Sequence, residues 1–248
     1  MRVSTPEGTP IGHDLTMPSA PISDTSYFQM WSKALPRRNF VDRDEFLLSR
    51  AAGKSVLHLG AADAPFHKEK AEAGALLHQK LARVAGHLQG IDADEDAVNY
   101  LRNHHGIHNI AAADVCAAPS AFALGSFDVI LCCDIVEHVC EPAALLRACA
   151  QWMHRDSRLI VTTVNALSAK AALRAAIGRE AVHPDHVSYF SYATLAQLLI
   201  RNGFRPLEYA TFAYPTVTRR AGVLFGLFHR IRPSTADGII IVAAASQR

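Results

Sequence analysis

The sequence lacks any apolar run of the roughly 18–20 residues that a membrane span needs, and its N-terminus lacks the apolar stretch of a secretory signal. Charge of one sign is also scarce, because 25 Lys and Arg residues stand against 23 Asp and Glu residues, a net charge of +2. These absences predict a cytoplasmic protein with no transmembrane segment and no general binding of nucleic acid, which usually needs a clustered basic face.

Cysteine is sparse and lacks the spacing of disulfide or zinc frameworks. The 248 residues include five cysteines with no CxxC pair, and four of them lie in apolar runs that favour burial. We therefore expect reduced core thiols. An apolar fraction of 50% and a charged fraction of 19% exclude wholesale disorder, and the length suffices for a sizeable core.

From residue 54 onward, short apolar runs alternate with segments of helical periodicity. Strands are predicted at residues 55–59, 87–91, 107–113, 127–133 and 158–164, and helices at 66–84, 94–105 and 142–153. Ser191 then caps a helix that ends near Asn202, and strands follow at 207–214 and 238–245. This order predicts an α/β fold: a Rossmann-like, doubly wound sheet of seven strands, mostly parallel with an antiparallel last strand.

The two ends of the chain differ from this regular part. Residues 1–24 are rich in Pro, Ser, Thr and Gly and predict a flexible tail, whereas residues 25–53 predict a short helical segment. The main domain covers residues 54–248, with acceptor or lid elements around 165–192 and 215–235. The amphipathic stretch 217–232 fits an interfacial membrane helix, but a lid or a dimer contact is favoured.

Small and acidic residues follow the first four predicted strands. Gly60 follows the first strand, and Asp92, Asp114 and Asp134 follow the next three. Ligands of open α/β sheets bind beyond the carboxyl ends of the strands, so these residues should lie around one pocket. A carboxylate accepts hydrogen bonds from a ribose diol or an exocyclic amine, and glycine permits a tight turn. The set predicts a pocket for adenosine.

Four stretches, residues 55–63, 90–94, 113–115 and 127–139, resemble the motif series of class I S-adenosylmethionine-dependent methyltransferases, closest to the type-11 and type-23 small-molecule groups. The resemblance covers about residues 54–205, and 183–204 is similar to the segment after the fifth strand of that group. It implies S-adenosylmethionine as cofactor and a small-molecule or glycan-type acceptor. The first loop departs from the family pattern, since Ala62 and Ala64 replace glycines and His58 stands where an acid is common.

The resemblance also implies roles for single residues. It predicts eight cofactor-binding residues: Gly60, Ala61, Ala62, Asp92, Ala93, Asp114, Val115 and Asp134. The first three line the methionine part and Asp92 holds the ribose hydroxyls. Asp114 faces the adenine amine with Val115 against the ring, and Asp134 or its carbonyl meets the methionine ammonium. Helix or loop capping is the alternative role for Asp114 and Asp134.

Three histidines are candidate general bases if the acceptor atom is oxygen: His186, His183 and His138, in that order. A structural role is an equal alternative for each. Residues 104–108 hold three further histidines, but no cysteine or carboxylate stands near them, so we predict a solvated surface and no metal site.

Two other functions are also compatible with the sequence, and so is a homodimer. A non-catalytic subunit that binds S-adenosylmethionine for an active partner would explain the alanines in the first loop. A nicotinamide-dependent reductase is disfavoured, because it needs a G-x-G-x-x-G loop and an acid about 20 residues on, and Asp92 lies beyond that offset.

Overall fold

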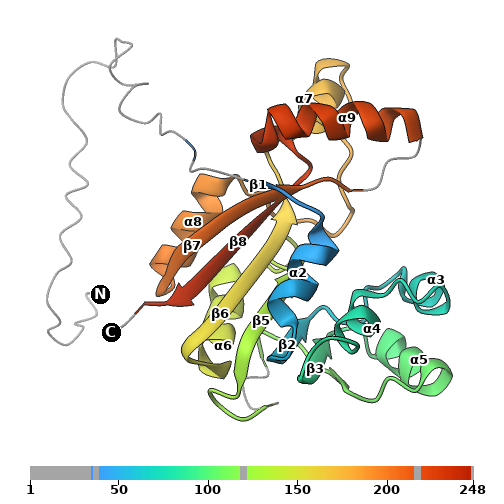
Figure 1. The fold of residues 1–248 in the computed structure, drawn as a ribbon, viewed down its shortest axis with the longest axis vertical. Helices are drawn as coiled ribbons and strands as arrows, with labels where there is room; N and C mark the ends of the chain where they lie inside the picture. The colour runs from blue at the N-terminus through green and yellow to red at the C-terminus, as the bar shows by residue number, and fades with distance from the viewer. Residues whose placement is uncertain (1–34, 36–38, 118–121, 215–218, 247–248) are drawn as a thin grey trace, which may run out of the picture. The chain divides into compact units, whose positions relative to one another are not determined.

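The structure is a computed structural model that describes residue 35 and residues 39–117, 122–214 and 219–246 (Figure 1). The predicted flexible tail of residues 1–24 and the start of the predicted helical segment lie outside these residues. The strands are β1 (Asn39–Phe40), β2 (Ser55–Leu59), β3 (His87–Asp92), β4 (Ile110–Ala112), β5 (Phe127–Cys133), β6 (Met153–Val164), β7 (Phe204–Phe212) and β8 (Gly238–Ala245). The helices are α2 (Arg43–Ala51), α3 (His67–Glu72), α4 (Leu77–Leu81), α5 (Glu95–His105), α6 (Pro142–Trp152), α7 (Ala169–Ala176), α8 (Tyr192–Arg201), α9 (Arg219–Ile231) and the 3₁₀ turn η2 (Pro233–Thr235).

The strands form one sheet in the order β1-β7-β8-β6-β5-β2-β3-β4. β8 runs antiparallel to both β6 and β7, while the other pairs are parallel. The predicted fold class is therefore confirmed, including the antiparallel last strand. The two-residue β1, which pairs with β7, extends the sheet to eight strands where seven were predicted.

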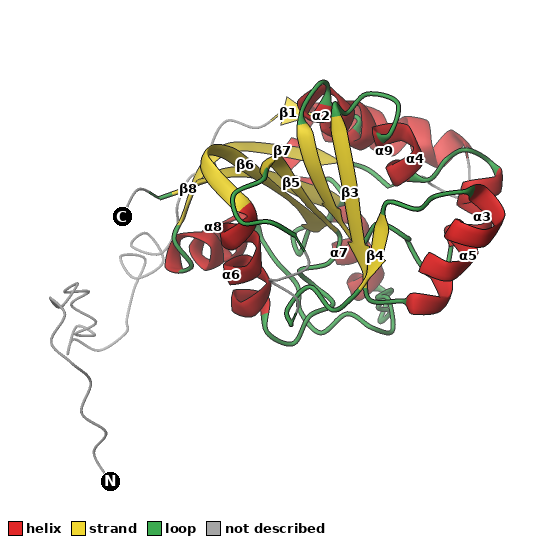
Figure 2. Cartoon of the chain, turned by 90° about the horizontal axis from the view of Figure 1, so that it is seen from below, coloured by secondary structure: helices red, strands yellow, loops and turns green. Residues whose placement is uncertain are grey.

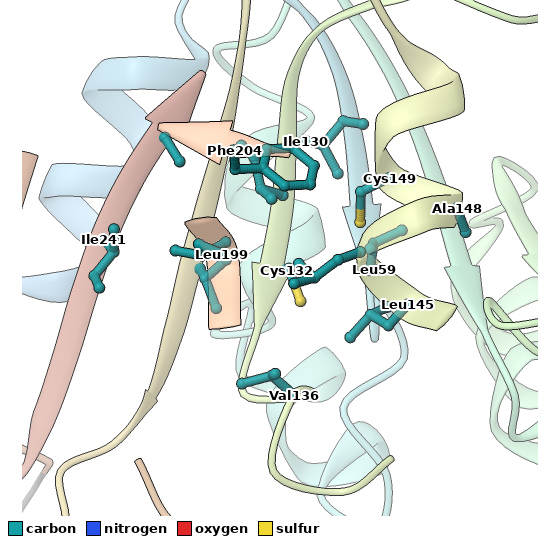
Figure 3. Packing of buried hydrophobic residues seen from close by; sticks show 14 of the residues in the cluster. Leu59, Ile130, Cys132, Val136, Leu145, Ala148, Cys149, Leu199, Phe204 and Ile241 are labelled. Atoms are coloured by element: carbon teal, nitrogen blue, oxygen red, sulfur yellow. The ribbon is translucent and has the colours of Figure 1, made fainter. Parts of the chain in front are cut away.

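Apolar side chains cover both faces of this sheet, as its near-continuous apolar strands require. Along β5, Ile130 and Cys132 pack on one face with α6 and α8, a cluster seen in Figure 3. Val129 and Leu131 point to the other face, where α2 and α4 supply a second cluster. Figure 2 shows α6 and α8 on one side of the sheet and α2 and α4 on the other.

Several helix ends form where the sequence predicted them. Gly106 ends α5 with a left-handed φ of 63°, which glycine adopts without strain. Pro142 occupies the first turn of α6, and Ser191 caps α8 in a capping box with Thr194. The predicted helix 66–84 instead divides into α3 and α4. Gly74 lies between them with a φ of 64°, a left-handed conformation that ends α3.

All five cysteines are free thiols. Cys132, Cys133 and Cys149 are buried, but Cys116 is only half-buried and Cys140 is exposed. The prediction of four buried thiols was thus wrong by one, since these last two follow strand ends on the polar edge of the sheet. Within the described residues, no helix is both long and apolar enough to cross a membrane.

Candidate functional site

A cavity of about 650 Å³ opens at the carboxyl ends of β2, β3, β4 and β5. Its volume lies in the usual range for small-molecule sites. Of the eight residues predicted to bind the cofactor, seven line this cavity: Gly60, Ala61, Asp92, Ala93, Asp114, Val115 and Asp134. The structure therefore brings together side chains from four separate strand ends on one rim of the sheet.

The turn after β2 places its first residues flat against the sheet. Gly60 takes a φ of 71°, and a Cβ there would lie 2.9 Å from Cδ1 of Ile135. The N–H groups of Gly60 and Ala61 donate to the Ile91 carbonyl at 2.9 and 3.2 Å, so they point to β3 and not into the cavity. Ala62 does not line the cavity, and its N–H donates to Asp92 Oδ2 at 2.8 Å.

Close packing under this turn gives a testable steric prediction. A Cβ at Gly90 in β3 would lie 2.7 Å from Ala61 Cβ, 2.8 Å from His78 Cε1 and 3.0 Å from Ile110 Cγ1. We expect Gly90→Ala to lower the free energy of unfolding by about 2 kcal/mol in chemical denaturation, because overpacking forces neighbours to shift. Gly226→Ala is the control, since a Cβ there meets nothing within 4 Å. Equal stability of both variants would contradict the prediction.

Asp92 and Asp114 each accept hydrogen bonds from backbone N–H groups nearby and keep further lone pairs that can accept from a ligand. Asp92 Oδ1 accepts from Asp94 N–H at 2.9 Å, in addition to the Ala62 bond. A carboxylate has about four lone-pair sites, so two remain for a diol. Asp114 Oδ1 accepts from Cys116 N–H at 2.8 Å, a turn bond of the predicted capping kind. Both carboxylates line the cavity as well.

Asp134 lies at the centre of a polar network that the sequence did not predict. Its φ of 54° is left-handed, and its carboxylate accepts from Arg43 Nη2 at 2.6 Å, Thr162 Oγ1 at 3.0 Å and Tyr214 Oη at 3.1 Å. Arg43 comes from α2 and Tyr214 follows β7, so this network joins distant parts of the chain. Arg43 and Tyr214 also line the cavity and were missed by the sequence reading.

Charge and burial determine the protonation of this network. Burial opposes the charged form of Arg43, but Asp134, with smaller contributions from Cys133, Tyr214 and Asp44, outweighs it and raises the guanidinium pKa above its ordinary value. Burial, together with Asp134, raises the pKa of the Tyr214 phenol well above its usual range. The cavity therefore presents a cation, Arg43, and a carboxylate, Asp134, side by side. A zwitterionic amino acid carries a carboxylate and an ammonium group, which could pair with these two charges respectively.

A second ion pair lines the outer part of the cavity. Lys70 of α3 donates to Asp63 Oδ2 at 2.5 Å, and both residues border the cavity. Burial raises the pKa of Asp63, while the hydrogen bond from Lys70 opposes that rise. Lys70 therefore pairs with Asp63, whereas Arg43 pairs with Asp134.

His58, which lines the cavity, and His78 form a buried pair that continues to Asn109. His78 Nε2 lies 3.2 Å from Asn109 Oδ1, and the Asn109 amide donates to the Leu88 carbonyl at 3.0 Å. Asn109 Oδ1 is therefore the acceptor, His78 carries its proton on Nε2, and His58 Nδ1 donates to His78 Nδ1 at 3.3 Å. Burial lowers the pKa of His78 to about 4 and that of His58 well below its ordinary value.

The three predicted bases also come together. His138 and His183 line the cavity, whereas His186 lies behind them with its ring centroid 4.5 Å from that of His138. Burial, followed by the neighbouring imidazoles, lowers the pKa of His186, and burial together with His183 lowers that of His138. Both rings are consequently neutral at pH 7 and offer a lone pair.

Glu137, next to His138, is a further titratable group that sequence reasoning passed over. Its side chain is fully buried, and burial raises its pKa to about 7, with Asp134 contributing in the same direction. Its backbone carbonyl accepts from the N–H groups of Val187 and Ser188 at 2.9 and 3.2 Å. These two bonds hold the loop that carries His183 and His186 against the end of β5.

Comparison with known proteins agrees with this geometry. A family model described as a methyltransferase domain matches residues 30–209. A curated relative from Aromatoleum aromaticum, named ubiquinone biosynthesis O-methyltransferase, is 28% identical over 209 residues, which are 79% of this chain and 81% of the relative.

Two solved structures share the fold. A SAM-dependent methyltransferase from Archaeoglobus fulgidus is 18% identical with a TM-score of 0.51, over 81% of this chain and 94% of that chain. A SAM-dependent methyltransferase from Aquifex aeolicus is 15% identical with a TM-score of 0.54, over 82% of this chain and 89% of that chain. At such identities the likeness concerns the arrangement of helices and strands.

Proposed function

The chain belongs to the class I S-adenosylmethionine-dependent methyltransferase family, and we propose that it methylates a hydroxyl oxygen of a small-molecule or glycan-type acceptor. The observation that carries this proposal is the single cavity that Asp92, Asp134 and His138 line together. The curated relative named as an O-methyltransferase supports oxygen as the acceptor atom. Family membership also removes the nicotinamide-dependent reductase from consideration.

The donor set around the cavity fits the proposed cofactor. Asp92 has two lone-pair sites left for ribose hydroxyls, and Asp114 faces the same space with Val115 beside it. Arg43 supplies a cation for a carboxylate, and Asp134 supplies an anion for an ammonium group. The cofactor provides an activated methyl group on a positively charged sulfur. We assign the residues of the first loop to the methionine part, with Ala62 acting through Asp92.

On the acceptor side, the three histidines are proposed to act on the hydroxyl. As the O–CH₃ bond forms and the S–CH₃ bond breaks, the electron pair of the broken bond stays on sulfur. The hydroxyl proton then needs a destination, and a neutral imidazole within reach accepts it. His138 and His183 border the cavity, while His186 contacts His138 from behind. Holding the acceptor oxygen and the methyl group in line can lower the activation barrier by roughly 7–11 kcal/mol.

The acceptor elements are proposed to come from residues 165–192 and 215–235. α7 and α9 lie beyond the end at which β6 finishes (Figure 1). Both expose apolar side chains to solvent: Leu173 on α7, and Leu227, Phe228 and Ile231 on α9. Such surfaces suit a lid over an acceptor or a contact with a second copy. A cytoplasmic location and a homodimer remain predictions.

The proposal is tested by calorimetry with S-adenosylhomocysteine, the product form of the cofactor. We expect 1:1 binding that weakens about tenfold or more in Asp92→Asn, because the amide cannot accept from two hydroxyls and Ala62 together. Asp96→Asn is the matched control, since Asp96 is exposed on the first turn of α5 and does not line the cavity. Absent binding, or equal loss in both variants, would defeat the site assignment.

The acceptor class is tested by mass spectrometry. Panels of phenols, aliphatic alcohols and sugars are incubated with S-adenosylmethionine and screened for added methyl groups. Methylation of a hydroxyl is the expected result. Cofactor binding without turnover on any acceptor would instead favour a non-catalytic subunit.

A further inference from the structure

His138, His183 and His186 form the tightest group of potential metal ligands among the described residues. One ligand nitrogen from each ring lies within 4.8 Å of the other two. The ring centroids are 4.5 Å apart for His138 and His186, and 5.4 Å apart for each pair that includes His183. All three side chains are half-buried at the end of β5.

The backbone builds this group, so it does not arise from chance contacts of mobile side chains. The Glu137 carbonyl accepts from Val187 and Ser188 N–H groups, which fixes the loop after residue 182 against His138. Within that loop, His186 N–H donates to the His183 carbonyl at 3.1 Å. The two histidines are therefore held in a tight turn, with their rings facing the third.

The contact among the three imidazoles leaves one buried polar atom without a partner among the described residues. His186 Nδ1 is buried and has no hydrogen-bond partner within the described parts of the chain. Burying an unsatisfied polar nitrogen is unfavourable. A cation at the centre of the group would satisfy lone pairs from all three rings at once.

We propose that His138, His183 and His186 bind one divalent transition-metal ion of the Zn²⁺ class, with a coordination position open toward the cavity. Three protein ligands and an open position are the usual arrangement of catalytic zinc, and imidazole is a preferred ligand for such ions. His138 and His183 line the cavity, so the open position faces the space assigned to the acceptor.

To bind an ion, the three imidazole nitrogens need to move only slightly closer together. Zinc–nitrogen bonds of about 2.0–2.1 Å place tetrahedral nitrogens roughly 3.4 Å apart, compared with the present spacing of up to 4.8 Å. Side-chain rotation on the loop can supply this. His183 Nδ1 accepts from the Asp185 N–H at 3.3 Å, which helps to hold this ring in place.

This inference deepens the proposed function. The catalytic role of the ion rests on the proposed methylation of a hydroxyl oxygen. An acceptor hydroxyl bound at the open position would lose its proton to solvent more readily, because the ion stabilises the alkoxide or phenoxide. That oxygen then takes the methyl group, with the electron pair of the broken S–CH₃ bond remaining on sulfur. The ion would replace an imidazole as the group that activates the hydroxyl.

The test is a titration of the chelator-treated full chain, without a polyhistidine tag, with Co²⁺ as the probe ion. We expect visible absorption bands of four- or five-coordinate Co²⁺ that saturate at one equivalent and are displaced by Zn²⁺. His183→Ala and His186→Ala should each weaken Co²⁺ binding on the order of 100-fold. His108→Ala is the control, because His108 is exposed and outside the group.

Two results would overturn the inference: no Co²⁺ bands at millimolar metal, or bands that survive both His183→Ala and His186→Ala. S-adenosylhomocysteine calorimetry on His186→Ala keeps this test separate from the proposed function. His186 does not line the cavity, so cofactor affinity should stay within about threefold of the parent chain while metal binding is lost. Lost metal binding in a variant that no longer folds is recognised by its circular dichroism, and His183→Gln then repeats the measurement.

Discussion

Arg43→Met should lower the free energy of unfolding by about 3 kcal/mol and weaken S-adenosylhomocysteine binding about 100-fold. The guanidinium donates to Asp134 at 2.6 Å, and the side chains of this pair are only 20% and 27% exposed. Methionine fills similar space but leaves the partly buried Asp134 charge without its cation. Urea denaturation and calorimetry measure the two effects separately.

Arg50→Met is the matched control for this prediction. Arg50 is on the same helix and pairs with Glu208 at 2.8 Å, but its side chain is 44% exposed, so the substitution should cost less than about 1 kcal/mol. Combining Arg43→Met with Asp134→Asn should recover part of the lost stability, since the unpaired charge is removed as well. Strictly additive effects of the two substitutions would contradict a coupled pair.

The role of Arg43 illustrates which features a single sequence can and cannot predict. Strands and helix ends depend on local chemistry, so the runs of apolar residues and the caps at Gly106 and Ser191 sufficed for the fold. Arg43 reaches Asp134, 91 positions away, only because α2 packs against the sheet next to β1. Nothing in the local sequence distinguishes this arginine from the exposed Arg50 on the same helix.

The acidic residues and the histidines show the same division at the site. Asp92, Asp114 and Asp134 were predictable because parallel strands bring their carboxyl ends to one edge, wherever the intervening helices lie. The contact between His138 and His186 depends instead on the Glu137 carbonyl and two N–H groups of a loop 50 positions later. Candidate bases can thus be named from residue type, but their convergence into one group requires the coordinates.

The buried pair His58 and His78 predicts a loss of stability in acid. The pKa of His78 is lowered by burial to about 4, compared with 6.5 for the unfolded chain. The unfolded state therefore binds more protons than the folded state between these values, and stability falls as the pH drops through 6.5. His78 alone should contribute a loss of about 2 kcal/mol between pH 7.5 and pH 5.

The measurement is urea denaturation of the parent chain and of His78→Gln at several pH values from 7.5 to 5. Glutamine keeps a donor and an acceptor for Asn109 and His58 but does not titrate, so the stability difference between the two chains should shrink steadily as the pH falls. His108→Gln, at an exposed position, should run parallel to the parent. Parallel curves for His78→Gln would mean that the buried ring takes up a proton as readily in the folded chain as in the unfolded one. In that case the fixed tautomers of the hydrogen-bond chain from His58 to Asn109 would have to be abandoned.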